Sequence, residues 1–242
     1  MTRMLASVRD LREAEIAVGG GADILDLKEP AGGALGVPPA AVLRAVSRRY
    51  GARLPVSAAI GEPPLSWAGL AVAAQAAAAA GVALLKMGLY AADPNPELPP
   101  LLRRLRGRGL RVVLVYLAEG GVPSLACLRR QAAAGAFGAM LDTREKEAPP
   151  LPRRLRPVRL RRFVAQARAA GLLCGLAGSL AEGDIPALLE LRPDYLGFRG
   201  ALCRGGRTGR LEAGCVSRIR ARIPVRGSSS LPAPRSAAAN ML

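Results

Sequence analysis

Three lysines are the residues of this sequence best suited to covalent chemistry. Of its 35 basic residues only Lys28, Lys86 and Lys146 are lysine, and the other 32 are arginine. A lysine amine becomes a nucleophile when burial or a neighbouring cation lowers its pKa, whereas an arginine guanidinium stays protonated. This sequence uses arginine wherever positive charge alone matters, so the three lysines are predicted to do something that arginine cannot. Carbonyl chemistry is what such amines suit.

Histidine is absent from all 242 residues. Its absence excludes Ser-His-Asp and Cys-His nucleophilic machinery, histidine-ligated metal sites and proton transfer by imidazole. Proton transfer must therefore use Lys, Asp, Glu, Tyr or Cys. The four cysteines at positions 127, 174, 203 and 215 show no CxxC spacing, so we expect reduced, mostly buried thiols.

The formal net charge of +17 suggests at first a polyanionic partner. Aromatic residues make up only 3% of the chain, and none interleaves an arginine run, so platforms for base stacking are scarce. We therefore expect no nucleic-acid partner. Ordinary surface charge and attraction of small anionic substrates account for the arginines instead.

Short apolar runs alternate with Ala-, Leu- and Arg-rich segments that end at glycine. This alternation is typical of repeated βα units and a parallel sheet. Strands are predicted at residues 4–8, 24–28, 55–60, 83–88, 111–117, 138–142, 172–177 and 195–199, and helices at residues 40–49, 67–80, 97–105, 124–134, 160–170 and 185–191. Eight units in about 225 residues fit a small TIM-type (β/α)₈ barrel, predicted over residues 1–224. A doubly wound open sheet is the alternative, but no GxGxxG or GxxxxGK[ST] motif follows the first strand.

Two segments fall outside these units. Residues 147–159 are rich in Pro and Arg and predict an irregular loop, while residues 225–242 predict a disordered tail. The uncharged run at 67–85 has the length of a membrane span. It is mostly alanine and is broken by Gly81, so a helix followed by a strand is predicted instead. The first residues lack an export signal, so a cytoplasmic protein without a membrane partner is expected. The Ala-rich helices could pack against another subunit, which leaves a homo-oligomer open.

The lysines fall where such a barrel carries its catalytic residues, at the C-terminal ends of strands and in the loops beyond them. Lys28 ends the second predicted strand, Lys86 lies late in the fourth, and Lys146 follows the sixth. Strand side chains alternate between the two faces. This parity predicts that residues 24, 26 and 28, 84 and 86, and 140 and 142 all point inward. The amines would then meet the carboxylates of Asp26 and Asp142, which could orient or deprotonate them.

A phosphate site is predicted beside them. Gly178 and Ser179 follow the seventh strand, and Arg199 and Gly200 end the eighth. In many barrels of this type, backbone N–H groups and an arginine hold a phosphate at this position. Ordinary turns are the alternative reading of these residues.

Seven segments resemble, in order and spacing, those of one enzyme family. They are ASVRD, GGADILDLKEPAGGALG, PVSAAIGE, LLKMGLY, AMLDTREK, LAGSL and GFRGALCRGG, and they extend over about residues 4–209. The family is that of the (5-formylfuran-3-yl)methyl phosphate synthases. The resemblance implies a lyase with a (β/α)₈ barrel that condenses two molecules of glyceraldehyde 3-phosphate into 4-(hydroxymethyl)-2-furaldehyde phosphate. Phosphate and water are released, and the furan enters methanofuran or methylofuran, which carry one-carbon units.

The same resemblance implies roles for the polar residues. Lys28 in DLKEP matches the Schiff-base lysine, and Lys86 in LLKMG matches the proton acceptor. Asp26, Asp142 and Lys146 match further polar positions of the same site. One triose phosphate would form an imine with Lys28, its enamine would attack the second aldehyde, and Lys86 would remove protons to drive phosphate loss, cyclisation and dehydration. This route requires no metal and no organic cofactor.

Two other functions stay open from the sequence. A generic Schiff-base aldolase acting on another sugar phosphate would share the lysine adduct and differ in its product. An Arg-rich nucleic-acid-binding protein without catalysis would retain DNA or RNA in a salt-sensitive way and would tolerate Lys28→Arg.

Overall fold

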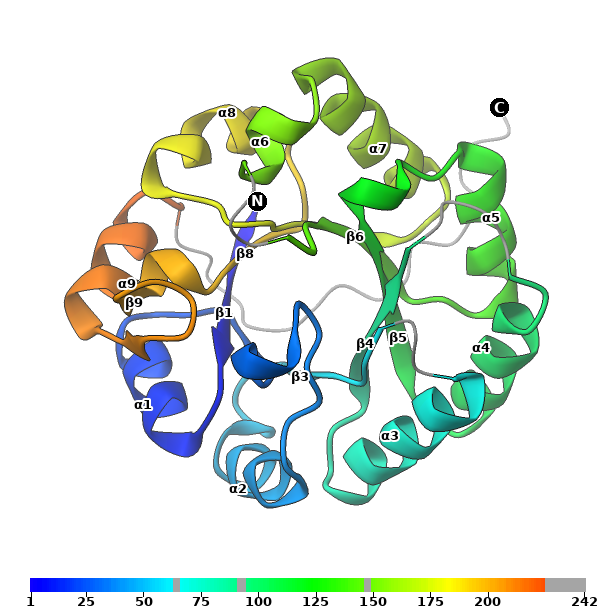
Figure 1. Cartoon of the computed structure of the whole chain (residues 1–242), viewed down its shortest axis with the longest axis horizontal. Helices are drawn as coiled ribbons and strands as arrows, with labels where there is room; N and C mark the ends of the chain where they lie inside the picture. Colours follow the sequence, from blue (N-terminus) through cyan, green and yellow to red (C-terminus); the bar gives the residue numbers. More distant parts are fainter. Residues whose placement is uncertain (63–65, 91–94, 146–148, 225–242) are drawn as a thin grey trace.

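The core of the fold is a closed barrel of eight parallel strands, in the order β1 to β8, with helices forming a ring around it (Figure 1). The computed structural model describes residues 1–62, 66–90, 95–145 and 149–224. The barrel closes where Arg3 and Met4 pair with Tyr195 and Leu196. The predicted (β/α)₈ barrel is therefore confirmed, and the open-sheet alternative is wrong.

The strands match their predicted positions to within one residue at each end. They are β1 (Arg3–Val8), β2 (Ile24–Leu27), β3 (Val56–Ala59), β4 (Leu84–Leu89), β5 (Arg111–Leu117), β6 (Gly138–Asp142), β7 (Leu173–Leu176) and β8 (Tyr195–Phe198). A short hairpin, β9 (Cys203–Arg204) and β10 (Arg210–Leu211), follows β8.

The surrounding helices include every one that was predicted, with ends shifted by three residues or fewer. They are α1 (Leu11–Gly19), α2 (Ala40–Tyr50), α3 (Trp67–Ala79), α4 (Leu98–Gly107), α5 (Leu125–Ala134), α6 (Leu151–Arg154), α7 (Pro157–Ala169), α8 (Ile185–Glu190) and α9 (Ala213–Ala221). Short 3₁₀ turns, η1 (Pro30–Gly32), η2 (Ala118–Gly120), η3 (Glu182–Asp184) and η4 (Gly200–Leu202), lie in loops that follow strands. The last helix, α9, packs beside the first, α1, which completes the ring (Figure 1).

Strand parity divides the apolar residues between two cores. Outward-facing residues such as Leu25 and Leu85 belong to the core between strands and helices. Ile24, Leu84 and Met140 belong to a separate cluster inside the barrel. This division confirms the predicted parity, and it gives the polar side chains above those three residues an apolar floor.

The predicted irregular loop at 147–159 contains helix α6 and the start of helix α7 in its described part, residues 149–159. Helix α6 starts directly after Pro150, and α7 starts at Pro157. Proline is favoured in the first helical turn because its missing N–H would have no intrahelical acceptor there. The prolines therefore mark two helix starts, and the prediction was wrong. Lys146, with residues 147 and 148, lies outside the described residues, as does the predicted tail at 225–242.

The uncharged run at 67–85 forms α3 and the start of β4, as predicted. Within the described parts of the chain, none of the helices combines the length and the apolar character that crossing a membrane requires. All four cysteines are buried free thiols, which confirms that prediction as well.

Candidate active site

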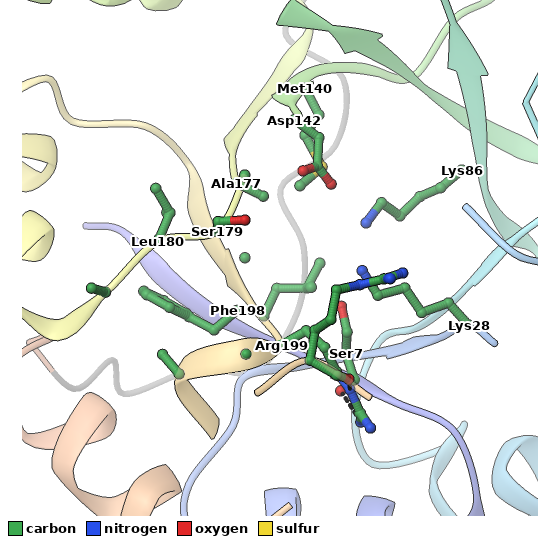
Figure 2. A pocket seen from close by; sticks show the side chains of 17 residues that line it. Ser7, Lys28, Lys86, Met140, Asp142, Ala177, Ser179, Leu180, Phe198 and Arg199 are labelled. Atoms are coloured by element: carbon green, nitrogen blue, oxygen red, sulfur yellow. Dashed lines mark hydrogen bonds between the residues drawn. The ribbon is translucent and has the colours of Figure 1, made fainter. Parts of the chain in front are cut away.

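A cavity of about 280 Å³ opens at the C-terminal ends of the barrel strands. Its lining includes most of the predicted site residues, namely Lys28, Lys86, Asp142, Gly178, Ser179, Arg199 and Gly200. In Figure 2, the side chains of Lys28 and Lys86 extend into the cavity from one side, and Asp142 and Ser179 face it from elsewhere on its wall. The structure thus gathers residues from five different strands around one space, while Lys146 lies outside the described residues.

The two lysines reach the cavity from buried positions. Lys28 is 6% exposed and Lys86 is 3% exposed. Lys28 lies one residue beyond β2, where its backbone N–H donates to the carbonyl of Val8 at 3.1 Å. Lys86 lies within β4, paired with Ala59 on one side and Val113 on the other. Strand hydrogen bonding therefore fixes the backbone from which each amine extends.

Asp26 lies beneath the lysines and is fully buried. One of its carboxylate oxygens, Oδ2, is 2.9 Å from Nζ of Lys86 and accepts a hydrogen bond from Oγ of Ser7 at 3.0 Å. Its other oxygen, Oδ1, accepts one from Oγ of Ser57 at 2.7 Å. A buried carboxylate is stable only with such compensation. The ammonium of Lys86 and the carboxylate of Asp26 therefore form a fixed charge pair at the cavity floor.

The two serines were not singled out from the sequence, although a signal for them existed. Ser7 and Ser57 lie directly beside Asp26 in the strand register, one on β1 and the other on β3. Residues at the same level of neighbouring parallel strands point to the same face. Once Asp26 is predicted to face inward, both hydroxyls are expected to face it.

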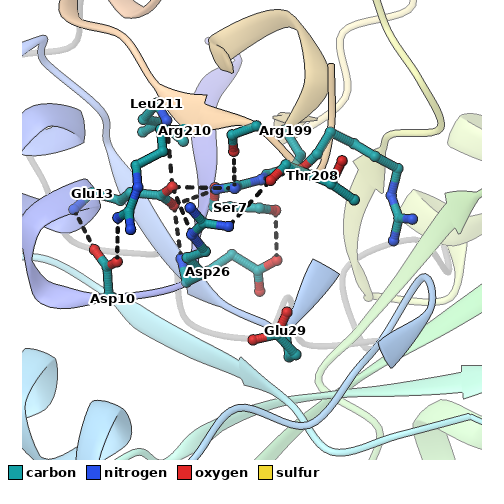
Figure 3. A network of polar contacts seen from close by, with 12 residues as sticks. Ser7, Asp10, Glu13, Asp26, Glu29, Arg199, Thr208, Arg210 and Leu211 are labelled. Atoms are coloured by element: carbon teal, nitrogen blue, oxygen red, sulfur yellow. Dashed lines mark hydrogen bonds and ion pairs between the residues drawn. The ribbon is translucent and has the colours of Figure 1, made fainter. Parts of the chain in front are cut away.

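The guanidinium of Arg199 is hydrogen-bonded to protein groups and has no free N–H group for a ligand in the cavity. Its Nη1 and Nη2 bind both carboxylate oxygens of Glu13 and also donate to the carbonyls of Ser7 at 3.1 Å and Gly209 at 2.8 Å. Its Nε donates to the carbonyl of Arg207 at 2.9 Å. All five of its N–H groups are thereby used, as Figure 3 shows in part. Glu13 already supplies an anion to this side chain, and its phosphate-binding role stays a prediction.

Backbone N–H groups are the better candidates for an anion. In the described structure, no protein acceptor contacts the N–H of Ser179, Leu180, Gly200 or Ala201, and all four residues line the cavity. Gly178 and Ser179 both have positive φ angles, 106° and 53°. A positive φ is rare for serine, and such strain is concentrated at ligand sites. Backbone donors arranged in this way form anion-binding concavities.

We expect Gly178→Ala to destabilise the protein. A Cβ there would lie 2.9 Å from Cγ2 of Thr143 and 3.0 Å from Cβ of Leu151, at a φ that alanine rarely adopts. The free energy of unfolding should fall by about 1–3 kcal/mol in urea titrations. Gly183→Ala is the matched control, because its Cβ would meet nothing within 4 Å, and it should stay within about 0.5 kcal/mol of the wild type. Equal stability of the two variants would contradict this account of the turn.

Comparison with known proteins shows the family to which this chain is related. The family model of 4-HFC-P synthase matches residues 4–220. The chain belongs to this family. A (5-formylfuran-3-yl)methyl phosphate synthase of Methanocaldococcus jannaschii is 33% identical over 230 residues, covering 90% of this chain and 97% of the relative. The synthase of Methanococcus maripaludis strain C7 is 34% identical over 228 residues, with coverage of 89% and 97%. The expected family resemblance is confirmed.

A protein of Methylorubrum extorquens that provisionally carries the same synthase name is 42% identical over 204 residues, covering 84% of this chain and 83% of the relative. Solved structures of other enzymes share the fold at low identity. A 3-hexulose-6-phosphate synthase superposes with a TM-score of 0.66 at 17% identity, covering 92% of this chain and 100% of that one. Phosphoribosyl anthranilate isomerase of Thermus thermophilus superposes with a TM-score of 0.62 at 19% identity, covering 91% of this chain and 98% of that one. These structures support the barrel fold of this chain.

Proposed function

We propose that this chain condenses two molecules of glyceraldehyde 3-phosphate into (5-formylfuran-3-yl)methyl phosphate, a lyase reaction that supplies the furan of methanofuran-type cofactors. Membership of the 4-HFC-P synthase family supports a furan phosphate synthase. The observation that carries the proposal is the convergence of Lys28 and Lys86 on one cavity, which Ser179, Leu180, Gly200 and Ala201 also line. The atoms balance without an oxidant or reductant, because two trioses give the furan phosphate, one inorganic phosphate and two waters.

The first chemical step is imine formation at Lys28. The neutral amine adds to the carbonyl carbon of one triose phosphate, and water leaves. Loss of a proton from the neighbouring carbon converts the imine to an enamine, whose carbon attacks the aldehyde of the second triose phosphate. That attack forms the new C–C bond. Hydrolysis of the imine later returns the lysine and consumes the water released at the start.

Lys86 and Asp26 are suited to the proton transfers. The ammonium of Lys86 first gives a proton to the hydroxyl that leaves as water during imine formation. The resulting amine then takes a proton from a carbon beside the carbonyl or imine, and the C–O bond to phosphate breaks, so that phosphate leaves with the electron pair. Asp26, held by two serine hydroxyls and the amine, stabilises the ammonium that forms. A hydroxyl then closes the ring on a carbonyl, and loss of two molecules of water makes the ring aromatic.

Product analysis tests this proposal. Purified protein incubated with glyceraldehyde 3-phosphate should produce a furan aldehyde with its ultraviolet absorbance, a matching mass in mass spectrometry, and one inorganic phosphate per furan. Absence of both products would overturn the proposal. An aldol product that retains both phosphates would show a Schiff-base aldolase instead.

Two substitutions separate the charge of Lys86 from its proton transfer. Lys86→Arg keeps a cation beside Asp26 but cannot release a proton, and Lys86→Met removes both properties. Both should lower kcat for phosphate release by about 10²–10⁴-fold, the effect of losing a general acid–base group. Only Lys86→Met should also lower thermal stability, because it leaves the buried carboxylate unpaired. An active Lys86→Arg variant would show that this lysine is only a counterion.

A further inference from the structure

Arg207 is a cation at the cavity that the proposed route does not use. It lies in the segment that connects β9 to β10, and its side chain lines the cavity together with Lys28 and Lys86. Nothing in the sequence separated it from the other arginines. Its guanidinium reaches from this hairpin to the loop after β2, where Nη2 donates to the carbonyls of Pro30 and, at 2.8 Å, Gly33.

The Nη1 group of this guanidinium has no protein acceptor among the described residues. Both hydrogen bonds of the side chain use Nη2, which leaves Nε–H and the two N–H groups of Nη1. This differs from Arg199, whose five N–H groups are all used. The N–H of Nε points to the Nη2 side of the guanidinium, so the donors left together for one anion are the two N–H groups of Nη1, which can donate to phosphate or carboxylate oxygens.

Hydrogen bonds fix both the hairpin that carries Arg207 and the loop that its guanidinium contacts. On the hairpin side, Nε of Arg199 donates to the carbonyl of Arg207 at 2.9 Å, and Nη1 of Arg9 donates to that of Thr208 at 3.1 Å. On the other side, the loop that accepts its hydrogen bonds is fixed where the N–H of Ala34 donates to Oε1 of Glu62 at 3.2 Å. A donor group ordered before binding gives up little conformational freedom when a ligand arrives.

The charges around Arg207 include carboxylates as well as cations. Burial lowers the pKa of its guanidinium, Asp142 and Glu62 oppose that shift, and Arg199 adds to it. An arginine in such surroundings remains protonated. A phosphate bound to it would share the cavity with the amino groups of Lys28 and Lys86.

We propose that Arg207 forms a second anion subsite, which binds a phosphate monoester through Nη1. The inference rests on the proposed function, in which two triose phosphates occupy one cavity. The backbone N–H groups after β7 and β8 can hold one phosphate. The guanidinium of Arg207, which reaches from the hairpin to the loop that follows Lys28, binds the other.

Binding of glycerol 3-phosphate tests the subsite without turnover. This compound carries the phosphate monoester but has no carbonyl, so it cannot form the imine. Isothermal titration calorimetry at about 0.15 M ionic strength, where exposed charges are largely screened, should show two molecules bound per wild-type chain. Arg207→Gln should bind one with unchanged affinity, while the second is weakened roughly 10- to 100-fold, as expected for losing hydrogen bonds to a charged group.

Arg204→Gln is the matched control, because it removes a cation from an exposed position of the same hairpin and should keep both sites. Arg207→Lys keeps the charge but not the planar guanidinium, in which the hydrogen bonds of Nη2 hold Nη1 in place, so it should also weaken the second site. One bound molecule in the wild type, or two in Arg207→Gln with unchanged affinities, would overturn the proposal.

Kinetics then separate this inference from the proposed function. In Arg207→Gln, borohydride trapping of the Lys28 adduct should need the same substrate concentration as in the wild type, whereas the KM for furan formation should rise roughly 10- to 100-fold. A purely structural role would lower stability and trapping together and would overturn the subsite. Absence of furan from the wild type would instead refute the proposed function, with the binding result still deciding the subsite.

Discussion

Lys28→Arg is expected to abolish turnover and leave the barrel folded. The arginine keeps a positive charge at a position that is 6% exposed and lines the cavity. Its guanidinium cannot become the neutral amine that adds to a carbonyl, so the covalent route is lost. We expect the rate of phosphate release to fall by more than about 10⁴-fold, beyond the effect of losing one acid–base group.

Two measurements identify the reason for that loss. Borohydride reduction in the presence of glyceraldehyde 3-phosphate should add the mass of one triose phosphate to the wild-type peptide that contains Lys28, and none to the variant. Lys86→Arg is the control, because it should be inactive but still form the adduct. Thermal unfolding should show that Lys28→Arg remains folded. Turnover within tenfold of the wild type would refute the covalent role of Lys28.

The barrel could be predicted from the sequence because each βα unit is encoded locally. Strands β5 and β6 coincide with their predicted residues, since short apolar runs bounded by glycine and polar residues mark them unambiguously. The error at 147–159 came from treating proline as a breaker. Proline ends helices but also starts them, and local composition does not distinguish Pro157 at the beginning of α7 from a proline in a loop.

The part of the site carried by strands could also be predicted, because strand parity is rigid. Residues 26, 28, 86 and 142 needed only a strand position and the alternation of faces to be placed around one space. Their chemical roles came from the family resemblance and stay predictions.

The arginines could not be assigned in this way. Arg199 meets Glu13, which lies 186 residues away in the sequence, and Arg207 meets Gly33, which lies 174 residues away. Both contacts arise only when the barrel closes and brings its last unit against its first two. From the sequence, Arg199 could be singled out only by its place at the end of the eighth strand, and Arg207 is one basic residue among 35.

Arg199→Met should have the largest effect on stability. Arg199 and Glu13 are both buried, and their ion pair joins α1 to the end of β8 (Figure 3). Removing Arg199 leaves the buried carboxylate with only the less buried Arg9, whose Nε is 3.3 Å away, and also unpairs the carbonyls of Ser7 and Gly209. The free energy of unfolding should fall by about 3–5 kcal/mol in urea titrations. This is a large part of the roughly 5–15 kcal/mol that stabilises a typical domain.

Arg210→Gln is the control, because it removes one positive charge from the β9–β10 hairpin that follows Arg199. Its ion pair with Asp10 is exposed, with 62% of the arginine side chain accessible, so its loss should cost less than about 1 kcal/mol. A double-mutant cycle that combines Arg199→Met with Glu13→Gln should give a large coupling free energy between the two residues. Because Nε of Arg199 also holds the carbonyl of Arg207, the folded Arg199→Met variant should bind the second glycerol 3-phosphate more weakly. A loss of stability no larger than that of Arg210→Gln would mean that this buried pair does not hold the last barrel unit against the first.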